Sequence, residues 1–135
     1  MITVPYYDAS GEEYGFLRSN PSILTTFYPS GSVGTVPEAI NLTGAITGRY
    51  YDATGDQHGF LRDRNGRLTK FDALGSNVAH AEAIDPLGVI TGFCDDTDGV
   101  QRGFQRSSVG RFTRFYPPGS TSLTPMLSIR TKGIP

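Results

Sequence analysis

The chain has 135 residues with 12 Lys or Arg and 13 Asp or Glu, giving a formal net charge of −1 at pH 7. This length fits one domain, and near-neutrality argues against nucleic acid as a partner, because binding phosphates needs clustered excess cations. Gly (17) and Pro (9) are abundant, and aromatic residues make up 11% of the chain without any Trp. This composition favours short strands joined by tight turns over a helical bundle or a coiled coil.

The two ends and the single cysteine narrow the class of protein further. Residues 1–6 lack the basic and apolar regions of a signal peptide. No run approaches the roughly 20 apolar residues of a membrane helix, so we expect no membrane span. Cys94 is the only cysteine, which excludes an intrachain disulfide, and we expect it to be a small buried residue.

A repeat is the main signal in the sequence. Its marker is a short Gly-Phe-x-Arg motif whose glycines stand at 15, 59 and 103, so the period is 44 residues. Nearly half of the positions in residues 2–45 are identical in 46–89, and the third copy covers 90–133. The motif residues, which we predict to be structural, are Gly15, Phe16, Arg18, Gly59, Phe60, Arg62, Gly103, Phe104 and Arg106. We therefore treat residues 1–135 as a single repeat domain.

Each copy is predicted to hold four short strands, because turn residues fall every 8–12 positions. In chain order, the sequence begins inside a second strand, since Ile2-Thr3 matches Ile46-Thr47. Residues 34–40 and 78–84 are predicted as loops that run into strands, because Pro37 interrupts the first of them. Strands are expected at 89–95, 102–106 and 111–116. The C-terminal segment 125–133 resembles 37–44 with one inserted residue, so we predict that it completes the first repeat of a partner chain or of its own.

Two all-β architectures accept such repeats. A β-propeller blade has four strands and 40–50 residues, but propellers usually have four to eight blades. Three repeats are therefore too few, and two chains exchanging their C-terminal strands would supply a six-bladed ring as a homodimer. The alternative is a β-trefoil, which closes with three repeats in one chain.

The middle copy carries the pattern Ile40-Asn41-x-x-Gly44-x-Ile46-x-Gly48-x-Tyr50-x-Asp52-x-x-Gly55-x-x-His58-Gly59-Phe60-Leu61-Arg62. It resembles the bacterial HAF-type repeat, which is described as extracellular and taken as propeller-forming. Tyr14 and Arg102 replace the family's His, and Gln105 replaces its Leu. The resemblance implies a propeller and an extracellular location, and it implies no reaction.

Most of the repeated residues have a structural interpretation. The glycine before each Phe leaves room for another backbone or ring. We expect Arg18, Arg62 and Arg106 to pair with Asp8, Asp52 and Asp96. The Asp-x-x-Gly turns predict carboxylates that accept backbone N–H groups, with glycine at positive φ. Calcium is the competing interpretation of these turns, and its candidates are Asp96 and Asp98.

Candidate ligand-binding residues lie in the segments that vary between copies, because variable loops on a repeated scaffold usually carry specificity. They are Tyr28, His80 and Tyr116. His58, His80 and Cys94 lack the spacing of a zinc site, and no motif indicates a catalytic residue or a cofactor.

These observations predict a non-enzymatic binding or scaffold module that assembles with itself and takes a glycan or protein ligand. The alternatives are a lectin-like protein, or a glycan-directed enzyme with paired carboxylates at the ring centre.

Overall fold

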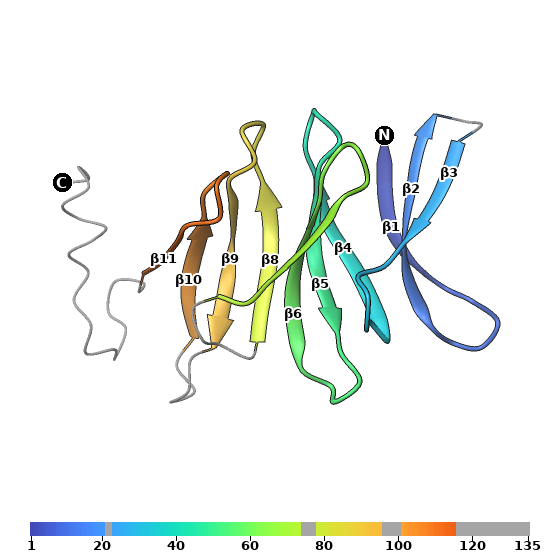
Figure 1. The fold of residues 1–135 in the computed structure, drawn as a ribbon, viewed down its shortest axis with the longest axis horizontal. Coiled ribbons are helices and arrows are strands. Elements are labelled where there is room, and N and C mark those ends of the chain that lie inside the picture. Colours follow the sequence, from blue (N-terminus) through green and yellow to red (C-terminus); the bar gives the residue numbers. More distant parts are fainter. Residues whose placement is uncertain (21–22, 74–77, 96–100, 116–135) are drawn as a thin grey trace.

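The computed structural model describes residues 1–20, 23–73, 78–95 and 101–115. In these residues the fold is all-β, and eleven strands form one open mixed sheet (Figure 1). The described residues contain no helix, and therefore none that is long and apolar enough to cross a membrane.

The strands fall into three units, which follow the 44-residue repeat. The first unit comprises β1 (Ile2–Tyr7), β2 (Glu13–Asn20) and β3 (Ile23–Phe27). The second unit comprises β4 (Gly34–Ile40), β5 (Ile46–Tyr51), β6 (Gln57–Arg62) and β7 (Leu68–Phe71). The third unit comprises β8 (Val78–Ile84), β9 (Ile90–Asp95), β10 (Gln101–Arg106) and β11 (Phe112–Phe115).

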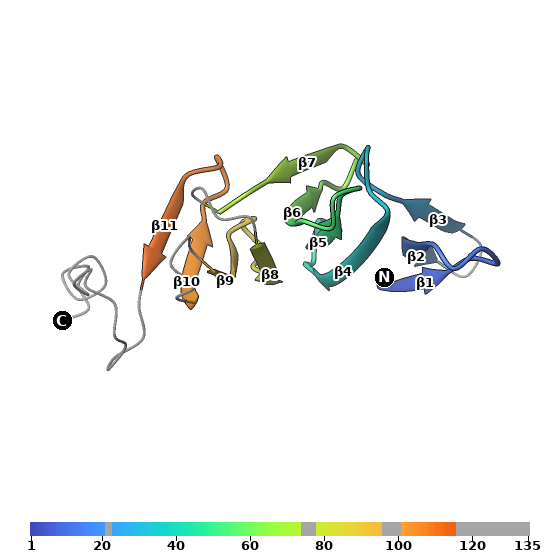
Figure 2. The ribbon, with the colours of Figure 1, turned by 90° about the horizontal axis from the view of Figure 1, so that it is seen from below.

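Within each unit, consecutive strands pair antiparallel, as short hairpin connections require. Strand pairing between neighbouring units is limited, among the described residues, to one parallel register pair at each junction, Glu13 with Gly34 and Gln57 with Val78. Figure 2 shows the units side by side as an open arc, with β1, β4 and β8 along one side and β3, β7 and β11 along the other. The units are therefore separate meanders that pack on one another.

The hairpins use one turn repeatedly. In the β5–β6 turn, Asp52 Oδ1 accepts hydrogen bonds from the backbone N–H of Thr54 and Asp56, and Gly55 has φ of 90°. Asp8, Asp63 and Asp85 accept backbone N–H groups in the same way in their own turns. The predicted role of Asp8 and Asp52 as turn carboxylates is thus confirmed.

The first strand of the second and third units carries a β-bulge. The pairing register shifts between Pro37 and Ala39 in β4, and between Ala81 and Ala83 in β8. Residues 34–40 and 78–84 are strands throughout, so the predicted loop at their start is wrong. Pro37 is accommodated because a bulge relieves its residues of regular ladder pairing.

The core lies between the units. Phe27 of the first unit packs on Phe60 of the second with ring centroids 5.9 Å apart, and Phe71 packs on Phe104 in the same way at 6.3 Å. Phe60 and Phe104 are fully buried, as is Cys94, whose predicted burial is confirmed. Burying a side chain of this size stabilises the fold by about 1.5–3 kcal/mol.

The motif glycines exist because of this packing. A Cβ placed on Gly59 would lie 2.3 Å from the ring of Phe71, and one on Gly15 or Gly103 would lie 2.4 Å from Phe27 or Phe115. The predicted close approach of a ring is confirmed. The predicted phase is also confirmed, because β1 occupies the place of β5 and β9. Neither a propeller nor a trefoil ring is closed in the single chain, and residues 125–133 lie outside the described residues.

Candidate functional site

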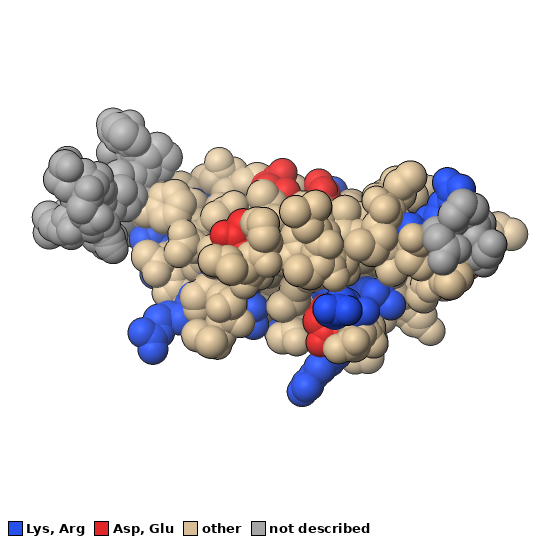
Figure 3. All heavy atoms as spheres, turned by 90° about the horizontal axis from the view of Figure 1, so that it is seen from above, with Lys and Arg blue, Asp and Glu red and all other residues tan. Residues whose placement is uncertain are grey.

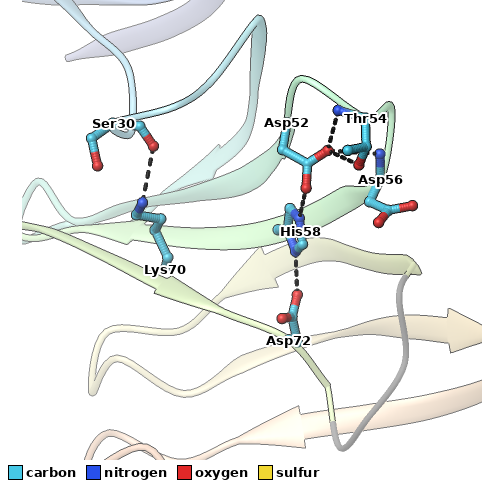
Figure 4. Close-up of polar contacts among 7 residues, drawn as sticks. All are labelled: Ser30, Asp52, Thr54, Asp56, His58, Lys70 and Asp72. Carbon is cyan, nitrogen blue, oxygen red and sulfur yellow. Dashed lines mark hydrogen bonds and ion pairs between the residues drawn. The ribbon is translucent and has the colours of Figure 1, made fainter.

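Two groups of charged side chains lie among the described residues. The first, which we name the His58 clamp, consists of Asp52, His58 and Asp72 (Figure 4). His58 on β6 has Nε2 2.7 Å from Asp52 Oδ2 in the β5–β6 turn and Nδ1 2.5 Å from Asp72 Oδ1 just after β7. The imidazole ring also lies 5.0 Å from the ring of Tyr50. The side chain of His58 thus connects the β5–β6 turn to the end of β7 in the same unit.

The clamp favours the charged form of the imidazole. Burial lowers the pKa of His58, but the hydrogen bonds to Asp52 and Asp72 outweigh it and raise the pKa above its usual value. The hydrogen bond from His58, followed by that from Thr54, holds the pKa of Asp52 well below its usual range. Both nitrogens of the ring are occupied by carboxylates, so this histidine has no free nitrogen for general-base chemistry.

The first unit repeats the clamp with other side chains. Tyr14 stands at the His58 position and hydrogen-bonds Asp8, which contributes to the lowered pKa of Asp8 after its bonds to Ser10 and Glu12. Tyr28 stands at the Asp72 position, and its ring lies 5.4 Å from that of Tyr14. Since different chemistry fills the same place, the clamp is a structural tie in the first and second units.

The second group, the His80 cluster, consists of Glu38, Arg49, His80 and Glu82. Glu38 on β4 and Arg49 on β5 form an ion pair, and Arg49 Nη1 also lies 2.9 Å from His80 Nε2 on β8. Glu82 Oε2 is 3.1 Å from the same nitrogen. The cluster therefore spans the junction between the second and third units.

Side chains around the cluster fix the imidazole of His80. Its ring stacks on Phe93 at 4.4 Å, and the neighbouring Gln57 Nε2 donates to the carbonyl of Ala79 at 3.0 Å. Burial, and then the charge of Arg49, lower the pKa of His80. Arg49 can only donate, so the neutral ring accepts at Nε2; a protonated ring would donate to Glu82 instead.

The predicted ion pairs of Arg18 with Asp8 and of Arg62 with Asp52 do not form, whereas Asp96, the expected partner of Arg106, lies outside the described residues. Arg62 lies over the ring of Phe27 and Arg106 over that of Phe71, each 5.2 Å from the ring centroid. Asp52, the expected partner of Arg62, is bound to His58 and Thr54 instead. The aromatic ring of the preceding unit therefore takes the place that the prediction gave to a carboxylate.

The structure does not bring the predicted ligand residues together. Tyr28 follows β3 and is 51% exposed, whereas His80 lies on β8, and β4, β5 and β6 stand between them (Figure 1). Tyr116 and the calcium candidates Asp96 and Asp98 lie outside the described residues. Within the described ranges, no group of His, Cys, Asp or Glu is arranged to hold a metal ion.

Three members of the His80 cluster, Glu38, Arg49 and Glu82, were not among the candidates predicted from the sequence. Glu38 carried a usable signal, because it repeats as Glu82. Arg49 carried none, because Pro5 and Phe93 occupy its counterpart positions.

The surface adds no charged patch on the face that Figure 3 shows, where acidic and basic side chains lie scattered among uncharged atoms. No family model, curated protein or solved structure shows significant similarity to the chain. The resemblance to the HAF-type repeat therefore stays a prediction.

Proposed function

We propose that the chain is a non-enzymatic scaffold module whose three units are propeller blades, and that two copies assemble into a six-bladed ring. The observation that carries this proposal is the open arc of three units that pack face to face (Figure 2). Propellers typically need four to eight blades to close. Three units leave the arc open, and a second copy supplies the remaining three.

The ties between units support a rigid scaffold. Asn41 Nδ2 donates to the carbonyl of Asp85 at 2.9 Å, which joins the second unit to the third. Lys70 Nζ donates to the carbonyl of Ser30 at 2.9 Å, which joins the second unit to the segment after β3 (Figure 4). These contacts fix the angle between neighbouring units, and a fixed angle is what a closed ring requires.

The state of the polar side chains favours a scaffold over a glycan-directed enzyme. Three carboxylates of the His58 clamp and the His80 cluster bind protein groups: Asp52 binds a turn, Asp72 binds a histidine and Glu38 binds an arginine. The fourth, Glu82, is exposed. A glycosidase needs two carboxyl groups free to face a sugar from opposite sides.

The test is the mass of the full chain in solution. Size-exclusion chromatography with light scattering should give twice the 14.6 kDa of one chain at micromolar concentration. A particle of 14.6 kDa that persists as the concentration is raised would reject the ring.

A further inference from the structure

The two junctions inside the chain use the same set of contacts. At each, a Phe from the last strand of one unit packs on the motif Phe of the next unit and lies beneath the motif Arg of that unit. These sets are Phe27 with Phe60 and Arg62, and Phe71 with Phe104 and Arg106. The repeat therefore defines a donor side, which presents the outer Phe, and a receiving side, which presents the motif Phe and Arg.

Among the described residues, the arc ends with one side of each kind that no other unit covers. The first unit holds the receiving residues Phe16 and Arg18, and Arg18 is exposed. The third unit holds the donor residue Phe115, whose ring rests on Gly103 as the ring of Phe71 rests on Gly59.

The receiving side of the first unit exposes apolar side chains that are buried at the equivalent positions of the other units. Ile2 is 52% exposed, whereas its counterparts Ile46 and Ile90 are fully buried by the preceding unit. Leu24 is 59% exposed, whereas its counterpart Leu68 packs against the core of the junction. The first unit thus keeps the apolar side chains of a buried face without a preceding unit to cover it.

We propose that the third unit of a second copy covers this face, with Phe115 of that copy packed on Phe16 and beneath the guanidinium of Arg18. The partner is a second copy because the donor side that fits is the one on the third unit, built from the same repeat. The contact is head-to-tail, and two such contacts close a ring of two chains. This inference rests on the proposed ring and names the surface that forms it.

One residue makes the junction between chains weaker than those within a chain. Leu17 and Leu61 occupy the donor sides of the first and second units and pack into the two junctions, whereas the third unit has Gln105, which is exposed. A polar side chain at this place leaves less apolar surface exposed to water when the chains are apart.

Three substitutions test the surface by sedimentation or light scattering of the full chain across concentrations. Arg18→Glu should weaken dimerisation roughly tenfold or more, because it removes a cation over an aromatic ring at two equivalent contacts. Phe115→Ser should weaken it roughly a hundredfold, since a large apolar side chain is lost at each contact. Gln105→Leu should tighten it roughly tenfold, a gain that misfolding would not produce.

Matched controls lie away from both sides. Arg64→Glu reverses an exposed charge in the β6–β7 turn, and Leu87→Ser removes an 80% exposed side chain in the β8–β9 turn. Neither should change the dimer, and Arg18→Glu should keep the circular dichroism spectrum of the wild type. If the three variants change the dimerisation constant no more than the controls do, the proposed contact surface is wrong, but the proposed ring is not contradicted. A wild-type chain that is monomeric throughout would overturn both.

Discussion

His58 and His80 sit in opposite electrostatic environments although both are partly buried histidines. His58 lies between the carboxylates of Asp52 and Asp72, whereas the ring of His80 faces the guanidinium of Arg49. A carboxylate favours the charged imidazole, and a guanidinium together with burial favours the neutral one. His58 therefore acts as a cation, and His80 acts as a hydrogen-bond acceptor.

The two titrations should therefore lie on opposite sides of the ordinary histidine pKa of about 6.5. Because the folded pKa of His58 is raised, its contribution to stability is complete below about 6.5 and is lost as the pH rises through the raised value. The folded pKa of His80 is lowered, so its contribution is complete above about 6.5 and is lost as the pH falls through the lowered value. Two-dimensional NMR of the imidazole protons measures both, since the chain has two histidines.

The variant Asp72→Asn serves as the control for this titration. It should lower the pKa of His58, because a neutral amide replaces the second carboxylate, and leave that of His80 unchanged. Equal pKa values for the two histidines in the wild type would contradict the clamp geometry.

Repetition predicted the role of the motif glycines and of the turn carboxylates, but it gave Arg62 the wrong partner and could not find residues that occur in one copy alone. The motif glycines were predicted to admit a ring, and each does, because the same packing recurs with the period. Arg49 and His80 contact one another across a junction, but neither residue repeats. Pro5 and Val36 stand 44 residues before them. A period of 44 reveals which positions share an environment, and it cannot show which unlike side chains meet between two units.

At the scale of strands, the bulged first strand of a unit determines one residue of the strand beside it. A Cβ on Gly48 would lie 2.2 Å from the carbonyl oxygen of Val36, and one on Gly92 would lie 2.0 Å from that of His80. The first unit has Val4 at this position on β1, and Val4 is 43% exposed. Any segment that pairs with the free edge of β1 must therefore follow a backbone path different from that of β4 and β8.

This difference predicts opposite responses to exchange at equivalent positions. Gly48→Val should destabilise the chain by about 2–3 kcal/mol, because the side chain meets backbone that cannot move without breaking the β4–β5 pairing. Val4→Gly should cost no more than about 1 kcal/mol, since it removes a half-exposed side chain from a strand. Chemical denaturation followed by circular dichroism measures both values. Equal losses at the two positions would show that β1 has the same neighbour as β5.

The bulge also explains which part of the strand prediction was wrong. The sequence predicts that Pro37 interrupts residues 34–40, yet the register shift beside it allows β4 to continue. Alternation and turn spacing predict where strands lie along a chain, but a bulge also depends on the partner strand. In the sequence, the bulge of β4 is marked by Gly48 on the strand beside it.

At the scale of the whole molecule, the units differ in how many of their faces are covered. The second unit has the first on one side and the third on the other, and both junctions bury aromatic rings. In the part of the chain that the structure describes, the first and third units are each covered by one neighbouring unit. Local stability should follow this order, because opening a unit covered on both faces exposes more apolar surface.

Hydrogen exchange measured by mass spectrometry tests this order and its dependence on assembly. In dilute solution, amides of β5 and β6 should exchange most slowly, and those of β1 and β3 faster. Raising the protein concentration should slow exchange in β1, β2 and β11, because a second copy covers both ends of the arc and stabilises the covered state by mass action. The exchange of β5 and β6 should change least, since their faces are already buried within one chain. Exchange in β1 that is independent of concentration, in a sample whose mass shows two chains, would place the contact between copies elsewhere on the molecule.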